Sequence, residues 1–361
     1  MSKKAIITGA TGQTGSFMAD YLLENTDLEI FGMVRRLSTP NTDNLKKALR
    51  SSRFKIIAGD LSDSQSINSV VEKVKPDYFF NFGAQSFVGS SWELPEQTFD
   101  VDAVGVIRAL DAIRRFAPEC RFYQAGSSEE LGKVLYSPQD ELHPHSARSP
   151  YGAAKMAARQ IVKVWRESYG LYAVQGMLFN HEGTRRGEEF VTRKISKGVA
   201  RILKSSDKSP IQLGNLDAKR DWSDAEDFVD GVWRMMNQEV HRTDWDSALK
   251  PADQIKEYIL ASGKTHSIRE FVQEAFYVAG VEGYWVGSAL EEKFVWRDGA
   301  ALRTLVEINP KFYRPCEVEL LHGSPSLAAK DLGWIPKSSF KELVAKMVKN
   351  DLAAFSRRSD D

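Results

Sequence analysis

The sequence predicts an α/β protein built around a doubly wound parallel sheet. Strand-like runs rich in β-branched or aromatic residues alternate with helix-like segments through the first half of the chain, and a glycine-rich turn joins the first strand to the first helix. Helices of this length between strands require right-handed crossovers, which produce a parallel sheet covered on both faces. The expected strands are 4–8, 29–34, 54–58, 78–82, 121–125 and 172–179, and the expected helices between them are 13–24, 64–75, 97–116 and 151–169.

The alternation loosens beyond residue 180, which indicates a second, smaller region of mixed α/β structure. We expect residues 1–180, with an interleaved later segment at 215–262, to form the sheet domain. Residues 181–361 should mainly form a C-terminal substrate-binding domain. Helices are expected there at 191–203, 224–237, 267–279 and 339–355, and the polar segment 239–254 is typical of a surface excursion.

Charge and cysteine content exclude several protein classes. Lys+Arg and Asp+Glu both total 49, and this balance argues against a nucleic-acid binder, which needs a cationic excess to neutralise phosphates. Cys120 and Cys316 are too few for a disulfide framework and lack metal-site spacing, so we expect no metal and a reducing compartment. The first apolar run is too short for a signal peptide and no membrane-length apolar stretch follows, so we expect a cytoplasmic protein with no membrane partner.

The glycine-rich turn predicts a dinucleotide site. It has the spacing GxxGxxG, and it lies directly between the first strand and the first helix. Glycines at such a turn let the backbone approach a pyrophosphate, which then sits at the helix N-terminus. The residues expected to contact the cofactor there are Gly9, Thr11, Gly12, Gln13, Thr14 and Gly15.

The end of the second strand favours NADP over NAD. Arg35 and Arg36 follow that strand, and no acidic residue is present to bind a ribose 2′-hydroxyl. Guanidinium groups suit a 2′-phosphate because they donate two parallel hydrogen bonds. Residues 1–180 are therefore expected to form an NADP-binding Rossmann domain, the alternative being that both arginines are solvated.

Two further strand ends fit the same pocket. Asp60 and Leu61 follow the third strand, where the carboxylate could accept a hydrogen bond from the adenine amino group. Gly83, Ala84 and Gln85 follow the fourth strand, where small residues would let the chain pass close to the cofactor. Ordinary strand-to-helix turns are the alternative interpretation of both segments.

Tyr151 and Lys155 form a candidate catalytic pair at the start of a helix. Residues spaced i and i+4 share a helix face, so the ammonium should lower the pKa of the phenol. Tyr151 would then act as a general base toward an alcohol. This pattern is common by chance, but here it is the only match and directly precedes a strand.

A serine-rich strand end contributes Ser127 and Glu129. Ligands bind at the carboxyl ends of parallel strands, so Ser127 could hydrogen-bond the substrate oxygen that Tyr151 serves. Glu129 is more informative, because a carboxylate beside a 4-keto sugar can remove the acidified C5 proton. The alternative is a serine-rich turn with a solvated glutamate.

With these residues in view, the chain resembles the GDP-mannose 4,6-dehydratase family of the extended short-chain dehydrogenase/reductase superfamily. The resemblance runs almost from end to end and includes Arg-Ser-Pro-Tyr-Gly-Ala-Ala-Lys at 148–155 and Leu-Phe-Asn-His-Glu at 178–182. Other matching motifs lie at 34–36, 81–86, 185–187, 190–194, 213–222 and 313–318.

The resemblance implies a hydro-lyase with NADP as cofactor and a GDP-sugar as substrate. Tyr151, helped by Lys155 and Ser127, would deprotonate the C4 hydroxyl during hydride transfer. Glu129 would then take the C5 proton and assist loss of the C6 hydroxyl as water, before hydride returns to C6. The product would be GDP-4-keto-6-deoxymannose.

The resemblance also implies a set of binding residues. Lys155, Tyr151, His181 and Arg186 would contact the cofactor, with His181 the weakest of these assignments. The residues implied for the nucleotide sugar are Ser86, Glu129, Asn180, Arg186, Val191, Lys194, Arg220, Arg314 and Glu317. Cations suit a diphosphate, and Glu317 could accept from a ribose or base donor.

The chain departs from the family pattern at several positions. Thr14 stands where the glycine loop usually has aspartate, and Ser127 takes a threonine position. Glu130 and Leu131 replace an apolar–aromatic pair, so leucine could loosen the packing behind the site, and the direction of the second carboxylate stays open. The less family-like region 283–303 could alter sugar-facing contacts.

Other functions stay open on the sequence alone. The substrate could be another GDP-linked sugar, such as a GDP-manno-heptose. A keto-sugar reductase or epimerase is a further alternative, but Glu129 counts against a pure reductase. A non-catalytic NADP-sensing module would not need Tyr151. We also expect a homo-oligomer, a dimer or tetramer, because the polar segment 35–44 crosses to a neighbouring subunit in the resembled family.

Overall fold

The computed structural model describes residues 2–39, 41–239, 254–313, 318 and 320–358. The inner part of the predicted excursion, 240–253, and Cys316 lie outside these residues. Within them, no helix is both long enough and apolar enough to cross a lipid bilayer.

A seven-stranded sheet forms the larger part of the molecule, and every pair of neighbouring strands in it is parallel. The strand order is β11-β6-β5-β4-β1-β2-β3. This arrangement confirms the predicted doubly wound α/β fold. The strands are β1 Lys4–Thr8, β2 Glu29–Val34, β3 Phe54–Ala58, β4 Tyr78–Asn81, β5 Arg121–Ala125, β6 Ala173–Leu178 and β11 Tyr258–Leu260.

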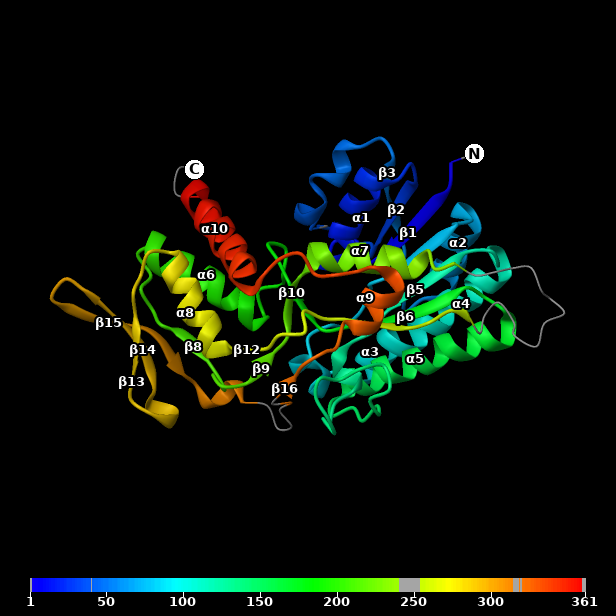
Figure 1. The fold of residues 1–361 in the computed structure, drawn as a ribbon. Coiled ribbons are helices and arrows are strands. Elements are labelled where there is room, and N and C mark those ends of the chain that lie inside the picture. Colours follow the sequence, from blue (N-terminus) through cyan, green and yellow to red (C-terminus); the bar gives the residue numbers. More distant parts are fainter. Residues whose placement is uncertain (1, 40, 240–253, 314–317, 319, 359–361) are drawn as a thin grey trace.

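Helices cover both faces of this sheet (Figure 1). One face carries α1 and α7, and the other carries α2, α4 and α5. The bounds of these helices are α1 Gln13–Asn25, α2 Ser64–Val74, α4 Gly105–Phe116, α5 Pro150–Tyr169 and α7 Ala225–Met236.

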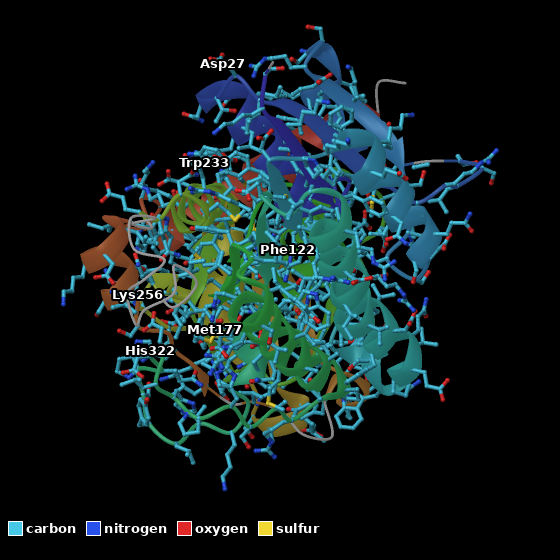
Figure 2. The ribbon with its side chains drawn as sticks, turned by 90° about the vertical axis from the view of Figure 1, so that its right-hand side faces the viewer. Asp27, Phe122, Met177, Trp233, Lys256 and His322 are labelled. Atoms are coloured by element: carbon cyan, nitrogen blue, oxygen red, sulfur yellow. The ribbon has the colours of Figure 1, made fainter. Side chains whose placement is uncertain are left out.

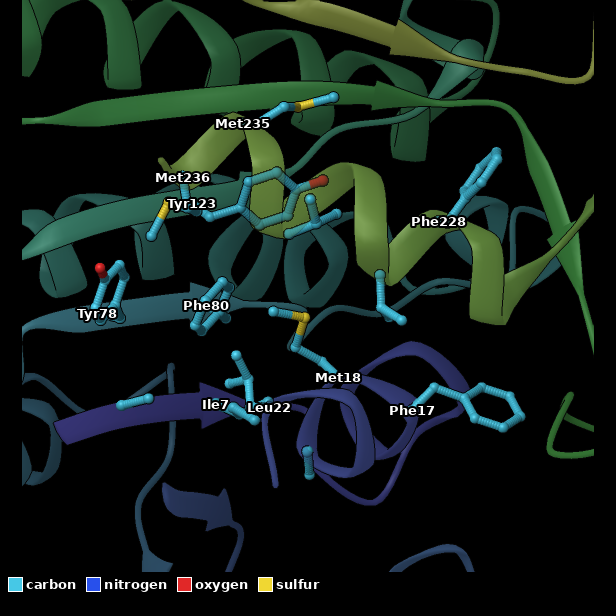
Figure 3. Packing of buried hydrophobic residues seen from close by; sticks show 14 of the residues in the cluster. Ile7, Phe17, Met18, Leu22, Tyr78, Phe80, Tyr123, Phe228, Met235 and Met236 are labelled. Carbon is cyan, nitrogen blue, oxygen red and sulfur yellow. The ribbon is translucent and has the colours of Figure 1, made fainter. Parts of the chain in front are cut away.

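Alternate strand residues enter the two cores because successive side chains of a strand point to opposite faces. Ile7, Phe80 and Tyr123 pack with α1 and α7, as Figure 3 shows beside Met18 and Phe228. The residue before each of these packs on the opposite face, as Ile6, Phe79 and Phe122 do. Phe122 is labelled in Figure 2. Burial on both faces explains why these strands are continuous apolar runs.

The rest of the chain forms a smaller region with its own core, away from the large sheet (Figure 1). Trp222, Phe271 and Leu343 are among its buried residues. Its helices are α6 Val191–Lys204, α8 Ile268–Val278 and α10 Phe340–Arg358, and its principal sheet contains β8 Ile211–Leu213, β13 Tyr284–Val286, β14 Lys293–Asp298 and β15 Ala301–Ile308.

Short elements connect the two regions. β7 pairs with β10, and β9 pairs with both β12 and β16. The bounds are β7 Asn180–Glu182, β9 Lys219–Arg220, β10 Trp222–Asp224, β12 His266–Ser267, β16 Leu320–Leu321 and α9 Ser326–Leu332.

Two elements from the later half of the chain return to the large sheet. β11 pairs with β6 at the sheet edge, and α7 packs against α1. Both lie within the interleaved segment 215–262 of the sequence analysis. The division at residue 180 stays a prediction.

The long helix expected at 97–116 is present as a continuous helical stretch, but it contains a π-helical turn that the sequence analysis did not predict. The structure has α3 Pro95–Phe99, then a π-helical turn at Asp100–Val104, then α4. A π-helical turn widens the backbone locally and is often found at functional sites. Here it carries Asp102, whose side chain is buried.

Candidate active site

A cavity of about 740 Å³ opens at the carboxyl ends of the strands of the large sheet. It lies where β1 sits between β2 and β4, so that successive crossovers leave in opposite directions. This is the position at which doubly wound sheets bind ligands. The smaller region closes the other side of the cavity with residues of β7, α6 and the segment between β8 and β10.

The glycine loop requires its glycines at two close approaches. Gly9 has a φ of +62°, and a Cβ there would lie 2.8 Å from the backbone nitrogen of Gly83. A Cβ on Gly15 would lie 2.3 Å from the carbonyl oxygen of Gly9. The backbone at the start of α1 therefore reaches the cavity wall, where Gly9, Thr11, Gly12, Gln13, Thr14 and Gly15 all line the cavity.

His181 ties this loop to β7. Its Nε2 lies 2.8 Å from Thr14 Oγ1 and its Nδ1 lies 3.0 Å from the carbonyl oxygen of Phe179. Gln13 donates to the carbonyl oxygen of His181 at 2.9 Å. Burial, with Arg186 nearby, lowers the pKa of His181 to about 4, so the ring is neutral. The threonine that departs from the family loop thus has a defined partner.

The residues predicted around the cofactor differ in where they lie. Arg35 and Arg36 are both exposed, and of the two only Arg35 lines the cavity. Asp60 Oδ1 accepts hydrogen bonds from the backbone and hydroxyl of Ser62, at 3.0 and 2.8 Å. The other predicted residues that line this part of the cavity are Leu61, Gly83, Ala84, Gln85 and Ser86.

The four predicted catalytic side chains meet at one wall of the cavity, which is lined by Ser127, Glu129, Tyr151 and Lys155. Ser149 caps α5 by accepting from the backbone of Gly152 at 3.0 Å. A Cβ on Gly152 would lie 2.6 Å from the carbonyl oxygen of Glu129, so the helix start packs directly on the 127–129 turn. Lys155 Nζ lies 5.7 Å from the centroid of the Tyr151 ring.

In this structure the pKa of Tyr151 is raised, whereas the sequence analysis expected it to be lowered. Burial raises the pKa of Tyr151, the Asp102 carboxylate raises it further, and a hydrogen bond with Ser127 opposes both. Lys155 Nζ lies 3.8 Å from Asp102 Oδ2 and donates to the carbonyl oxygen of Ala125 at 3.2 Å. The ammonium is therefore partly balanced by a buried carboxylate.

Asp102 is a site residue that the sequence analysis missed. Its Oδ1 accepts from the backbone of Gln85 at 2.7 Å, and burial raises its pKa to about 6 although Lys155 opposes the shift. The π-helical turn places it behind the cavity wall, with Oδ2 3.8 Å from Nζ of the lining residue Lys155. An acidic residue amid apolar positions of a predicted helix was the available signal.

A chain of hydrogen bonds also runs beneath the cavity. Thr8 donates to Asn81 at 2.5 Å, and Asn81 donates to Gln124 at 2.7 Å. Gln124 donates to the carbonyl oxygen of Ala125 at 3.1 Å, which is the oxygen that Lys155 also contacts. Polar residues at the ends of otherwise apolar strands are the sequence signal that could have identified this network.

The outer wall of the cavity carries the predicted cations. Lys194 Nζ lies 3.5 Å from the centroid of the Phe312 ring. Arg186 pairs with Glu182 at 3.0 Å and lies 3.5 Å above the ring of Phe190. Arg220, Asn180 and Val191 also line this wall, as do the unpredicted Phe190 and Phe312.

Arg314 and Glu317 lie outside the described residues. None of the residues 283–303 lines the cavity, so the expected sugar-facing role of this region was wrong: β13, β14 and β15 pair with each other at the far end of the smaller region.

Two buried features bear on what the cavity can hold. Asn180 Oδ1 is buried and has no hydrogen-bond partner among the described residues, which leaves it available to a ligand donor. Within the same residues, His, Cys, Asp and Glu side chains nowhere gather in a set of three that could hold a metal ion.

Leu131 and Glu130 lie behind the cavity. Leu131 has no exposed surface and packs with Met177, Phe179 and Ile259, so the looser packing considered from the sequence does not occur. Glu130 is also fully buried and does not line the cavity.

Comparison of the sequence with known families gives a full-length match. The profile of the family described as GDP-mannose 4,6 dehydratase matches residues 6–347. A GDP-mannose 4,6 dehydratase of Drosophila melanogaster is 45% identical, covering 97% of this chain and 86% of its own length. A GDP-mannose 4,6 dehydratase of Homo sapiens is 42% identical, covering 96% of this chain and 91% of its own.

Solved structures with the same fold are more distant in sequence. RMD from Pseudomonas aeruginosa, in complex with NADPH, superposes with a TM-score of 0.75 at 19% identity, covering 98% of this chain and 100% of its own. A dTDP-glucose 4,6-dehydratase of Bacillus anthracis, in complex with NAD, gives a TM-score of 0.74 at 16% identity, covering 96% of each chain. These likenesses concern the fold.

Proposed function

The chain belongs to the GDP-mannose 4,6-dehydratase family, and on that premise we propose that it converts GDP-mannose to GDP-4-keto-6-deoxymannose and water. The observation that carries the proposal is a single cavity that joins the glycine loop, the wall of Ser127, Glu129, Tyr151 and Lys155, and the cations of the outer wall.

The cofactor of this reaction is a nicotinamide dinucleotide, and we propose NADP. The glycine loop supports dinucleotide binding because its residues line the cavity at the start of α1, and its close turn has no room for a Cβ on Gly9 or Gly15. Arg35 on the cavity wall supports a 2′-phosphate, with Arg36 as a second cation nearby. Calorimetry with both cofactors tests this choice, and equal or tighter binding of NAD would count against it.

The first chemical task is oxidation at C4. When bound, the nicotinamide would accept hydride from C4 in its oxidised form and donate hydride to C6 in its reduced form, and the positive charge of the oxidised form would favour the Tyr151 phenolate. Tyr151 takes the proton of the C4 hydroxyl, and Ser127 hydrogen-bonds the same oxygen. Lys155, held between Asp102 and Ala125, stabilises the charge on the phenolate.

The second task is elimination of water. The C4 ketone acidifies the C5 proton, which Glu129 takes as its carboxylate, and the same group then delivers a proton to the departing C6 hydroxyl. The C5–C6 double bond would then accept hydride at C6 and a proton at C5, and this proton is balanced by the one that Tyr151 took from the C4 hydroxyl, so the site returns to its starting state. No net redox change results, because the hydride removed from C4 ends at C6.

The outer wall is proposed to hold the GDP part of the substrate. Lys194, Arg220 and Arg186 supply cations for the diphosphate, and Asn180 supplies an acceptor that has no partner among the described residues. Arg314 and Glu317 are proposed to join them, on the resemblance alone.

We also propose a homo-oligomer, a dimer or tetramer. Large apolar side chains are exposed just before and within α3 and on α5, which contacts α3, and a patch of this kind commonly marks a protein interface. It includes Trp92, Leu94, Phe99, Met156 and Val164. Light scattering at micromolar concentration tests this, and a monomeric mass would remove the idea.

The reaction is tested by incubating the protein and NADP with GDP-mannose and following the nucleotide sugar by mass spectrometry. Loss of one water supports the proposal. A mass change of two hydrogens without water loss would indicate a reductase, and an unchanged sugar would indicate a sensing module or a different GDP-sugar. GDP-manno-heptose as a second substrate separates the last two outcomes.

A further inference from the structure

Glu129 and Glu130 are neighbours in the turn that follows β5, but their side chains point in opposite directions. Glu129 lines the cavity, whereas Glu130 has no exposed surface and lies behind it. The resembled family usually has an apolar residue at the second position. A buried acid in place of an apolar side chain costs desolvation energy, so its contacts need an explanation.

Glu130 is hydrogen-bonded on both oxygens. Its Oε1 accepts from the backbone nitrogen of Ser127 at 2.8 Å, which closes the turn that ends in Glu129. Gln175, on the neighbouring strand β6, donates its Nε2 to both carboxylate oxygens at 2.9 Å. A Cβ on Gly126 would lie 2.8 Å from Oε1, so the backbone and the carboxylate fit closely.

Glu130 also anchors a second segment beside the active-site wall. Its carbonyl oxygen accepts from the backbone of Ser146 at 3.2 Å. His145 Nδ1 lies 3.8 Å from Oε2, and burial, with Arg159 nearby, lowers the pKa of His145 to about 4. The imidazole is therefore neutral and does not neutralise the carboxylate.

Charged groups on α5 and beside β11 act electrostatically on Glu130. Burial raises the pKa of Glu130 to about 7, and Arg159 and Lys155 of α5 oppose this shift. Glu257, beside β11, adds to the increase. Glu130 in turn raises the pKa of Tyr151 and, on β5, that of Tyr123.

We propose that Glu130 is a positioning residue, which holds the 127–129 turn so that Ser127 and Glu129 face the substrate. The inference rests on the proposed dehydratase function. Hydrogen bonds to the backbone of this turn and to β6 fix the turn against the sheet. An apolar side chain at 130 could fill the same space but could not accept from Ser127.

A glutamine at this position separates hydrogen bonding from charge. In Glu130→Gln, the amide oxygen can still accept from the Ser127 backbone. Rotation of the Gln175 amide would then present its Oε1, which is buried without a hydrogen-bond partner among the described residues, to the new Nε2. In Glu130→Leu, the Ser127 N–H and the Gln175 amide both lose their acceptor.

The test compares wild type, Glu130→Gln and Glu130→Leu in dehydration of GDP-mannose with NADP. We expect kcat to fall about ten- to a hundredfold in Glu130→Leu, with KM and NADP affinity nearly unchanged, and to stay within about threefold in Glu130→Gln. Because Glu130→Gln removes a negative charge near Tyr151, the rising limb of kcat/KM should also move to lower pH. A residue that only stabilised the fold would not move this limb.

Two measurements keep the result decisive. Glu141→Leu is the matched control, because Glu141 also accepts from a backbone nitrogen, that of Ile259 at 2.8 Å, but does not line the cavity. Hydrogen exchange of peptides spanning 126–131 should be faster in Glu130→Leu alone. Normal kcat or unchanged exchange in Glu130→Leu would overturn the proposal, whereas an inactive wild type with altered exchange in Glu130→Leu would count only against the dehydratase function.

Discussion

The two walls of the cavity are organised in different ways. On the sheet side, hydrogen bonds join Thr8, Asn81 and Gln124 across three parallel strands, and glycines bring the backbone of α1 to the cavity. Strand register therefore fixes the sheet edge, and the reacting groups are held on the turn and the helix that pack on this edge. The 127–129 turn is held further by Glu130.

On the outer side, each cation depends on local partners. Lys194 lies on the Phe312 ring, and Arg186 lies between Glu182 and Phe190. These segments come from different parts of the chain and are not joined by a continuous sheet. We therefore propose that the sheet side determines the chemical step, whereas the outer side determines affinity for the nucleotide.

Tyr151→Phe should give the largest effect and acts on the sheet side. Without the phenolic oxygen, neither C4 oxidation nor loss of water can begin, and general acid–base groups contribute about 10²- to 10⁴-fold to turnover. Turnover by mass spectrometry and bound NADPH by absorbance should both be near background. NADP affinity is the control and should persist; appreciable NADPH formation would show that another group takes the C4 proton.

Glu129→Gln should reduce turnover within the same range of about 10²- to 10⁴-fold but leave one signal. Glutamine keeps the volume and hydrogen bonding of the side chain and removes the base. C4 oxidation depends on Tyr151 and Lys155, so bound NADPH should accumulate without release of water. Near-normal turnover would make the carboxylate a bystander, and Glu130 could not replace it as the base because it does not line the cavity.

Lys194→Gln tests the outer wall. Removing a cation that pairs with a phosphate should raise KM for GDP-mannose about tenfold, with a smaller change in kcat. Lys197→Gln on the same helix is the matched control, because Lys197 pairs with Glu188 and does not line the cavity. A fall in kcat with KM unchanged would contradict the division between the two walls.

Asp102→Asn should give the smallest effect, a shift in pH dependence. The Asp102 carboxylate raises the pKa of Tyr151, so its removal lowers that pKa and the rising limb of kcat/KM moves to lower pH. Asp111→Asn is the control, because Asp111 pairs with Arg114 and Arg115 on the surface of α4. An unchanged limb, or one moved to higher pH, would show that Asp102 acts mainly by holding Lys155.

The large sheet and its helices could be predicted because local patterns report them directly. The strands at 4–8, 29–34, 54–58 and 121–125 match the predicted bounds because each is a short run rich in apolar residues, although the edge strand at 54–58 is largely exposed. The π-helical turn within the helix at 97–116 was not predicted, because periodicity does not register one wider turn.

The candidate site, like the fold, was predicted only in part from the sequence. Motif spacing brought Gly9, Tyr151 and Lys155 into consideration, and all three line one cavity, but spacing could not show that of the two exposed residues Arg35 and Arg36 only Arg35 lines it. Whether an arginine turns toward a cavity depends on the path of its loop, which no local pattern records.

By itself, the sequence determined the parallel α/β fold, the glycine turn and the identity of the groups available for catalysis, because these follow from residue types at short spacing. Only the tertiary structure decided what surrounds each group. It placed Asp102 against Lys155 and buried Tyr151, so that burial and the Asp102 carboxylate raise the pKa of Tyr151 rather than lower it. It also turned Glu130 away from the cavity. Burial and charge act between residues that are distant along the chain, so they appear only when the chain is folded.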